Sequence, residues 1–410
     1  MNKPELLVPA GSLPVLRVAV RYGADAVYIG GEEFSLRAGA DNFSREDMEE
    51  GIGFAHEHGV KVYVTANIFA HNEDLHGVKK YFKELSEYKN KPDAVLISDP
   101  GVFFTAKEVM PDIPIHISTQ ANNTNYMTFK FWYDQGVRRL VNARELSLEE
   151  IRGIRDNIPD DMEIESFVHG AMCISYSGRC LLSNFFTGRD ANHGECTHPC
   201  RWKYAVMEEK REGEYLPIEE NDRGTYIFNS KDLCMIDHIP ELVQAGINSF
   251  KIEGRMKAAL YVATVTRTYR KAIDDYFKGE EIYKQNLPWY RKQITASTYR
   301  PYCTGFYFGK PNETSQLYGA NSYERGYIYL GCVEKKDKNR IYITQKNKFS
   351  VGEDIEIMKP NGDNISVKVL SVTDEEGNAM ESAPHASQKL WVELSKEAEP
   401  LDIIRKADLS

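Results

Sequence analysis

Short apolar runs alternate with helical stretches over the first two-thirds of this 410-residue chain, and this alternation constrains the fold most. Runs such as Leu6-Leu7-Val8 and Ala94-Val95-Leu96-Ile97 are almost continuously apolar, which is typical of parallel strands covered by helices on both faces. The expected strands are 6–9, 26–30, 61–66, 94–98, 115–118, 139–142, 163–168 and 249–253. The expected helices are 15–22, 44–57, 75–88, 100–108, 126–135, 147–157, 233–245 and 256–277.

Strands that are each followed by a helix predict an α/β fold, a (β/α)8 barrel over residues 1–279 with its active site at the carboxyl ends of the strands. A doubly wound open sheet is the alternative, because periodicity does not show closure. One connection is abnormal: the seventh strand is followed by a long insertion, residues 170–230, where barrel loops usually have about 2–6 residues. Within it, residues 202–209 and 225–229 are predicted to pair as a hairpin.

The pattern changes after residue 279. Residues 280–325 form a connector rich in tyrosine and proline. From residue 326 to 410 the pattern is β throughout, with expected strands at 326–333, 340–344, 354–358, 365–372 and 390–394. Short strands separated by turn residues predict a small closed β-barrel or sandwich.

Five of the seven cysteines lie on the long insertion or the segment after it, namely Cys173, Cys180, Cys196, Cys200 and Cys234. Three kinds of site fit such a group. Structural zinc prefers closer pairs than most of these, an iron–sulfur cluster takes four thiolates at irregular spacings, and a cysteine nucleophile needs a neighbouring base such as His169. Cys303 and Cys332 fall outside the group and are expected to be buried packing residues.

The net charge of −10 disfavours bulk nucleic-acid binding, so an RNA site would need a local basic patch. Arginines and lysines do gather on the eighth helix and after Cys200, at Arg255, Lys257, Arg267, Arg270, Lys271, Arg201 and Lys203. No apolar run approaches the length of about 20 residues that spans a bilayer, and the start of the chain has no secretory leader. We therefore expect a cytoplasmic protein without disulfides.

Several motifs resemble peptidase family U32, the collagenase-like peptidases. They are the stretches 165–173 and 178–183 around Cys173 and Cys180, Leu7-Val8-Pro9-Ala10-Gly11, residues 196–204, residues 229–233 and Lys251-Ile252-Glu253-Gly254-Arg255. The resemblance covers nearly the whole chain and is greatest to the branch whose members make 5-hydroxyuridine at the wobble position of tRNA.

This resemblance implies a barrel, a 4Fe–4S cluster held by the cysteine loop, and prephenate as the source of the hydroxyl group. It implies Cys173, Cys180 and Cys196 as cluster ligands, with Cys200 as the fourth and Cys234 as its alternative. We expect Cys234 to open the seventh helix and to face the mouth of the barrel.

Side chains at the ends of strands are the first catalytic candidates in a barrel. We select Glu253, Arg255, Asn67, Gln120 and His169. Arg255 follows a glycine where such barrels often hold anions, and its guanidinium could hold a carboxylate of prephenate with two hydrogen bonds. The competing interpretations are an ion pair that braces the rim for Arg255, loop capping for the two amides and core packing for His169, as for His116. Trp202, Tyr204 and Tyr226 could stack an unpaired base.

The sequence thus predicts an enzyme that hydroxylates a tRNA uridine with prephenate. A collagenase-like peptidase and a cluster-carrying, non-catalytic partner subunit are the alternatives. The chain could act as a homo-oligomer or with another subunit.

Overall fold

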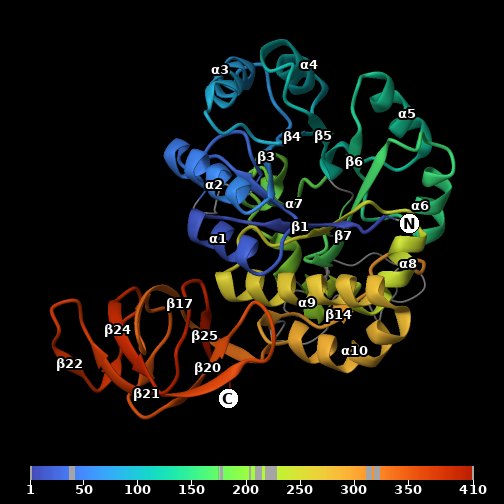
Figure 1. Ribbon diagram of the computed structural model, residues 1–410. Coiled ribbons are helices and arrows are strands. Elements are labelled where there is room, and N and C mark those ends of the chain that lie inside the picture. Colours follow the sequence, from blue (N-terminus) through green and yellow to red (C-terminus); the bar gives the residue numbers. More distant parts are fainter. Residues whose placement is uncertain are drawn as a thin grey trace.

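A closed ring of eight parallel strands forms the first domain (Figure 1). The computed structural model describes residues 2–36, 42–173, 175, 179–202, 205–207, 215–217, 229–310, 316–317 and 324–408. The strands of the ring are β1 (Glu5–Pro9), β2 (Ala26–Gly30), β3 (Lys61–Ala66), β4 (Ala94–Ile97), β5 (Ile115–Ile117), β6 (Arg139–Val141), β7 (Glu163–Gly170) and β12 (Ser249–Ile252). The pairing of β12 with both β7 and β1 closes the barrel, which confirms the predicted fold and excludes the open sheet.

Helices surround this ring and cover its outer face (Figure 1). They are α1 (Leu13–Arg21), α2 (Arg45–Glu57), α3 (Asp74–Glu87), α4 (Pro100–Val109), α5 (Tyr126–Asp134), α6 (Leu148–Arg155), α8 (Ile239–Gln244) and α9 (Ala259–Lys278). Serine and acidic residues start several of them; Ser147 and Glu150 form a reciprocal capping box at α6. Among the described residues, no helix is both long and apolar enough to cross a membrane.

The segment that returns from the cysteine loop differs from the prediction. The expected helix 233–245 begins later, at Ile239, because residues before it continue the sheet. β11 (Asp232–Cys234) pairs antiparallel with the end of β7, and a 3-10 turn, η4 (Ile236–His238), leads into α8. Cys234 therefore ends a strand and does not open a helix.

The hairpin predicted in the insertion paired residues 202–209 with the wrong strand. β8 (Ala205–Met207) pairs with β9 (Tyr215–Pro217), whereas β10 (Asn229–Ser230) pairs with β15 (Gln316–Leu317). Residues 225–228 lie outside the described part of the chain. The rest of the insertion contains α7 (Leu182–Thr187), η2 (Ala191–His193) and η3 (Pro199–Arg201).

The connector contains a helix that the sequence pattern did not reveal. α10 (Glu280–Ile294) packs against α9 in spite of Pro288 in its interior. Buried Asp275 of α9 accepts hydrogen bonds from Tyr290 (2.7 Å) and Asn286 (2.9 Å) of α10. The short strands β13 (Thr298–Tyr299), β14 (Tyr302–Cys303) and β16 (Glu324–Arg325) follow.

The C-terminal domain is a second, smaller closed barrel (Figure 1, orange to red). Its ring is β20 (Asp354–Met358), β25 (Ile403–Ala407), β17 (Tyr327–Asp337), β18 (Arg340–Thr344), β24 (Lys389–Leu394) and β21 (Ile365–Thr373), and β21 pairs back with β20. β22 (Ala379–Met380) extends β21, and β19 (Phe349–Ser350) pairs with β23 (Ser382–Ala383). Every second residue of β24 is buried, and these residues fill the core of the domain.

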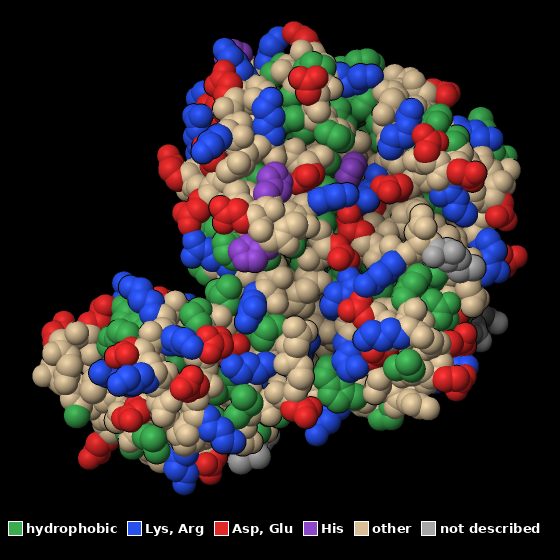
Figure 2. All heavy atoms as spheres, in the orientation of Figure 1, with side chains coloured by type: hydrophobic (Ala, Val, Ile, Leu, Met, Phe, Trp, Pro, Cys, Tyr) green, Lys and Arg blue, Asp and Glu red, His purple; other side chains and the backbone are tan. Residues whose placement is uncertain are grey.

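The C-terminal domain forms a smaller lobe beside the first barrel (Figure 2), and the two barrels are joined through α1 and α9. Val18, Tyr22 and Leu260 pack with Met358 and Ile403 in one small apolar cluster. The hydroxyl group of Tyr22 donates to the Met358 carbonyl (2.6 Å) and accepts from the Ile403 amide (3.1 Å). A buried hydroxyl that is bonded on both sides makes this contact specific as well as apolar.

Candidate active site

Four of the predicted catalytic residues line one cavity at the carboxyl ends of the strands. Asn67, Gln120, Glu253 and Arg255 all border this cavity, together with Arg144, which the sequence analysis did not select. Its volume is about 60 Å³. We call this cavity the mouth; it lies where (β/α)8 enzymes carry their active sites.

The two amide side chains follow β3 and β5, which are separated in the barrel by β4. Asn67 donates from Nδ2 to Ser118 Oγ (3.3 Å) and accepts at Oδ1 from the Leu36 amide (3.3 Å). Ser118 also caps the 3-10 turn η1 (Thr119–Ala121), which positions Gln120. The buried Oε1 atom of Gln120 has no hydrogen-bond partner among the described residues. An unsatisfied buried carbonyl is costly in a folded protein, so this oxygen is available to accept a hydrogen bond from a ligand.

Glu253 forms an ion pair with Arg144, which was not among the catalytic residues predicted from the sequence. Arg144 Nη2 lies 3.1 Å from Glu253 Oε2, and Nη1 donates to the Ala171 carbonyl (2.7 Å). The guanidinium also lies 3.8 Å from the centre of the Phe167 ring. Arg144 comes three residues after β6, so the strand-end rule that selected Asn67 and Arg255 could have found it.

Arg255 is buried and crosses the mouth to the opposite loop. Nη1 donates to Thr65 Oγ1 (2.7 Å), and Nη2 donates to Ser35 Oγ (3.2 Å) and to the Leu36 carbonyl. Gly30 leaves room for the guanidinium, because a Cβ atom there would lie 2.3 Å from Nη1. Arg255 therefore fastens β12 to β3 and to the loop after β2.

Beneath the mouth, the barrel interior holds paired charges. Lys251 Nζ lies 2.6 Å from Glu165 Oε1 and 4.6 Å from the centre of the Tyr28 ring. Burial lowers the pKa of Lys251, although Glu165 opposes this shift. Arg139 forms ion pairs with Glu5 (2.5 Å) and Glu163 (2.7 Å) at the amino ends of the strands. The pairs of Arg139 fill the barrel below the mouth, whereas Lys251 is itself one of the residues that line it.

His169 lies outside the mouth, contrary to its selection as a catalytic residue. A bulge in the pairing of β7 with β12, between Lys251 and Ile252, interrupts the alternation of side chains near His169. The ring packs against Tyr261, Tyr269 and Tyr302. Burial, with a smaller contribution from Lys257, lowers the pKa of His169 to about 3, so the imidazole is neutral. His116 is likewise buried, and burial lowers its pKa.

Cys234 shares this buried region. Its Sγ lies 3.9 Å from the hydroxyl oxygen of Tyr269, and its backbone pairs with that of His169. Burial raises the pKa of the thiol to about 12. The residue is nevertheless partly exposed, as Cys180, Cys196 and Cys200 are. A thiol with a raised pKa is a poorer metal ligand than one that ionises readily, because metals bind the thiolate.

The other four cysteines of the group of five lie on the loop after β7. Cys173 is exposed, whereas Cys180, Cys196 and Cys200 are partly exposed. The loop contacts the β3–α3 connection, where Asn192 accepts from the Phe69 amide (3.3 Å) and His193 lies 3.1 Å from Asp74. Within the part of the chain that the structure describes, no three histidine, cysteine or acidic side chains are grouped closely enough to hold a metal. The thiolates would have to move together to bind a cluster.

Exposed aromatic side chains also mark this loop. Phe185 and Phe186 of α7 are exposed, and the Phe186 ring lies 6.2 Å from that of Trp202. Trp202 is thus accessible to a base, while Lys203, Tyr204 and Tyr226 lie outside the described residues.

The basic residues of α9 are largely engaged within the protein. Arg267 is buried and donates to the Lys359 carbonyl (2.8 Å) and Asn364 (2.7 Å) of the C-terminal domain. Arg270 forms an ion pair with Asp25 (2.7 Å), and Lys271 pairs with Asp275 (2.6 Å). Arg267 and Arg270 therefore join α9 to other elements, whereas Lys271 pairs within the helix.

Sequence comparison gives the same division of the chain as the fold. The model of peptidase family U32 matches residues 11–317, and that of the family's C-terminal domain matches residues 325–405. The tRNA hydroxylation protein P1 of Bacillus subtilis is 40% identical over 99% of this chain and 95% of its own length. The tRNA hydroxylation protein P of Escherichia coli is 39% identical over 97% and 95% of the two chains.

A third relative is named for the modification of a different RNA. The 23S rRNA 5-hydroxycytidine synthase of Escherichia coli is 38% identical over 67% of this chain and 40% of its own length. The family model covers well over half of the residues, and the similarity to the first two relatives extends over nearly the full length. This chain therefore belongs to peptidase family U32.

Proposed function

We propose that this protein hydroxylates the wobble uridine of tRNA to 5-hydroxyuridine and takes the hydroxyl group from prephenate. The observation that carries the proposal is the similarity to tRNA hydroxylation proteins, which spans both domains. A cytoplasmic enzyme fits this substrate.

The mouth would receive the uracil ring. An enzyme that modifies a base must take it out of its stack. Gln120 Oε1 could then accept the hydrogen bond of an imide N–H, and Asn67 could bind a carbonyl oxygen. Both amides lie in the same cavity, and the oxygen of Gln120 has no partner in the described structure.

The cations of the mouth suit a dicarboxylate such as prephenate. Arg144 is the better candidate for the carboxylate, because Arg255 already donates from both Nη atoms to Thr65, Ser35 and Leu36. If a substrate carboxylate displaced the Glu253 carboxylate from Arg144, the guanidinium would still have an anionic partner. The cavity of about 60 Å³ is smaller than common ligand sites, which begin near about 300 Å³. The side chains that line the mouth must therefore move apart when substrates enter.

The 4Fe–4S cluster belongs to the proposal as a resident group of the cysteine loop. Cys173, Cys180, Cys196 and Cys200 would hold it, with Cys234 as the alternative fourth ligand. Their present arrangement does not fit a cluster, so the loop would fold around it on binding.

The family name offers peptidase activity as a second candidate. One contact favours it: Cys196 Sγ lies 4.0 Å from His198 Nδ1, the arrangement of a thiol beside a base. A thiol peptidase would cleave a collagen-like substrate and lose activity in Cys196→Ala.

The deciding experiment is nucleoside mass spectrometry of tRNA. Purified protein reconstituted with iron and sulfide is incubated with unmodified tRNA, with and without prephenate. Prephenate-dependent 5-hydroxyuridine supports the proposal. Absence of the product from the isolated protein, but its appearance with a cell extract, would indicate that a partner subunit is required. Proteolysis without any modified uridine would favour the peptidase.

A further inference from the structure

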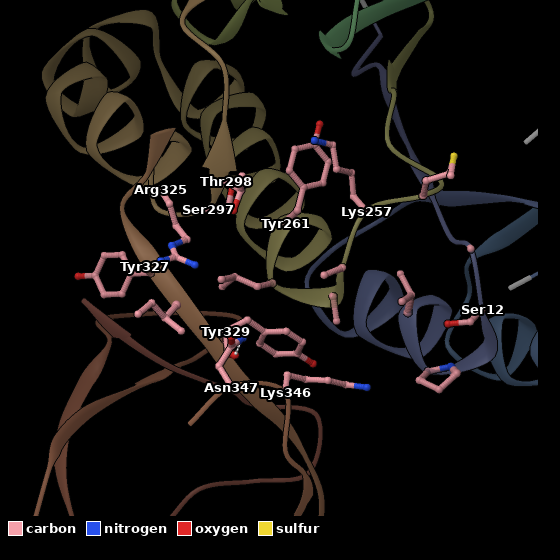
Figure 3. Close-up of a pocket in the computed structure, with 18 of the residues that line it drawn as sticks. Ser12, Lys257, Tyr261, Ser297, Thr298, Arg325, Tyr327, Tyr329, Lys346 and Asn347 are labelled. Atoms are coloured by element: carbon pink, nitrogen blue, oxygen red, sulfur yellow. Dashed lines mark hydrogen bonds between the residues drawn. The ribbon is translucent and has the colours of Figure 1, made fainter. Parts of the chain in front are cut away.

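A large groove lies between the barrel and the C-terminal domain (Figure 3). Its volume is about 850 Å³. One wall is the loop after β1 and the segment from Arg255 to Tyr261, and the other is the start of β17 with Lys346 and Asn347. A volume of this size is in the range of pockets that enclose organic ligands.

The charge of the groove is positive, although the protein as a whole carries −10. Lys257, Arg325 and Lys346 line it, and no aspartate or glutamate is among the described residues that line it. Arg325 pairs with Asp408 at the rim. Lys346 is exposed, and in the described part of the chain no carboxylate lies within ion-pair distance of its ammonium group. Cations gathered against the net charge of a protein attract an anion locally.

Aromatic and hydroxyl groups lie between these cations. Tyr327 and Tyr329 of β17 line the groove, and both are partly exposed. In Figure 3 the ring of Tyr329 points toward Lys346, whereas the ring of Tyr327 points away from the other labelled residues. The Arg405 guanidinium lies 3.9 Å from the centre of the Tyr327 ring and supports it from behind. The hydroxyl group of Ser297, a residue that is only 1% exposed, has no hydrogen-bond partner among the described residues. An unsatisfied hydroxyl in the wall of a groove suggests that a ligand supplies the missing partner.

The groove and the mouth share a wall. Arg255 lines both cavities, so a chain in the groove would pass directly beside a group in the mouth. Glycine at position 11 lets the loop after β1 approach this wall, because a Cβ atom there would lie 2.1 Å from the Arg255 carbonyl oxygen.

We infer that this groove binds the single-stranded RNA segment next to the nucleotide that enters the mouth. Lys257, Arg325 and Lys346 would contact phosphates, and Tyr329 would stack a base. Basic grooves with aromatic side chains are the usual design of single-strand RNA sites. The inference rests on the proposed function and adds the place where the RNA lies.

The test compares charge reversals at two exposed lysines of the same domain. Lys346→Glu changes the groove. Lys396→Glu is the control. Lys396 lies two residues after Leu394, whose backbone amide donates to the carbonyl of Asn339. Asn339 follows the end of β17 that is distant from the groove. Affinity of the full-length protein for unmodified tRNA is measured by filter binding over a series of salt concentrations. We expect Lys346→Glu to weaken binding at least about tenfold, the scale of a lost charged hydrogen bond, and Lys396→Glu to change it less than twofold.

Two further measurements separate the possible outcomes. Lys346→Ala should lower the slope of log affinity against log salt by about 0.7, the value for one phosphate contact with a single strand. Ultraviolet crosslinking should attach tRNA to peptides with residues 325–329 or 346–347. The inference is overturned if wild type modifies tRNA and Lys346→Glu binds tRNA as tightly as wild type does. It is also overturned if Lys346→Glu keeps its affinity for tRNA and loses only the binding of another protein. If wild type neither binds tRNA nor forms hydroxyuridine, the proposed function fails, and this inference with it.

Discussion

Two arginines at the mouth have different tasks in this structure. Arg255 holds three groups of the opposite loop and strand through its two Nη atoms. Arg144 meets one carboxylate and one carbonyl and is stacked on Phe167. Both follow strands of the barrel, so sequence alone could place both at the mouth. Their separate tasks depend on which loops cross it, which no local pattern encodes.

Arg255→Lys should therefore lower stability. A lysine has the charge but not the planar fork that reaches Thr65, Ser35 and Leu36 together. We expect the free energy of unfolding to fall by about 2–3 kcal/mol, since buried acceptors lose a charged donor. Urea unfolding followed by circular dichroism gives the value. An unchanged midpoint together with a raised prephenate requirement would restore Arg255 as the carboxylate ligand.

Arg144→Lys should act on prephenate instead. The loss of bidentate geometry is expected to raise the half-saturating prephenate concentration about tenfold, on the scale of one charged hydrogen bond. The rate at saturation should change less. Titration of prephenate with 5-hydroxyuridine as the readout checks this. A fall in the rate at every concentration, with the same half-saturation, would show that Arg144 only braces Glu253.

His169 should make stability depend on pH. Its pKa is lowered to about 3 by burial, whereas an unfolded histidine titrates near about 6.5. The unfolded chain therefore binds a proton first as pH falls, and stability is lost below about pH 6.5. Between pH 7.5 and 5.5 wild type should lose about 1 kcal/mol more than His169→Gln. Unfolding in urea at both values measures the difference, and equal losses would exclude this histidine as the cause.

At the scale of the element, the sequence predicts what local burial dictates. β2 (Ala26–Gly30) and β3 (Lys61–Ala66) have the predicted limits, because apolar runs bounded by polar residues mark strands covered on both faces. β11 was missed because its three residues form a strand through pairing with the distant strands β7 and β14. α10 was missed because Pro288 and the tyrosines disfavour a helix locally, whereas buried Asp275 of α9 bonds two of its side chains.

The cysteine loop gives a prediction about its ligands. Cys173→Ser, Cys180→Ser, Cys196→Ser and Cys200→Ser should each lose most bound iron, because four thiolates hold a 4Fe–4S cluster. Cys234→Ser should keep it, since burial raises the pKa of that thiol to about 12 and Tyr269 is in contact with it. Iron and sulfide assays of reconstituted protein measure both groups of variants. Full iron in Cys180→Ser, or its loss in Cys234→Ser, would require another ligand set. Cys332→Ala, in the other domain, is the control.

At the scale of the whole molecule, each barrel has its own core, and a small third cluster joins them. The division at residues 279 and 326 follows from the change in pattern, but this joint does not. Val18 and Leu260 belong to helices that the pattern assigns to the first barrel alone. Their partners Met358 and Ile403 follow about 100 or more residues later, and contacts at such separation are not encoded in periodicity.

Removal of the C-terminal domain should for this reason destabilise the barrel as well as remove the groove. A chain ending at residue 312 would expose Val18 and Leu260 to water and leave the Tyr22 hydroxyl without either of its partners. Each exposed apolar side chain costs about 1.5–3 kcal/mol, and the lost hydrogen bonds add about 1 kcal/mol each. We expect a lower melting temperature in scanning calorimetry and aggregation on storage. Val18→Gln with Leu260→Gln in the truncated chain should reduce the aggregation, because the exposed patch is then polar. A truncated barrel that melts like the full chain would show that the second barrel is only appended to the first.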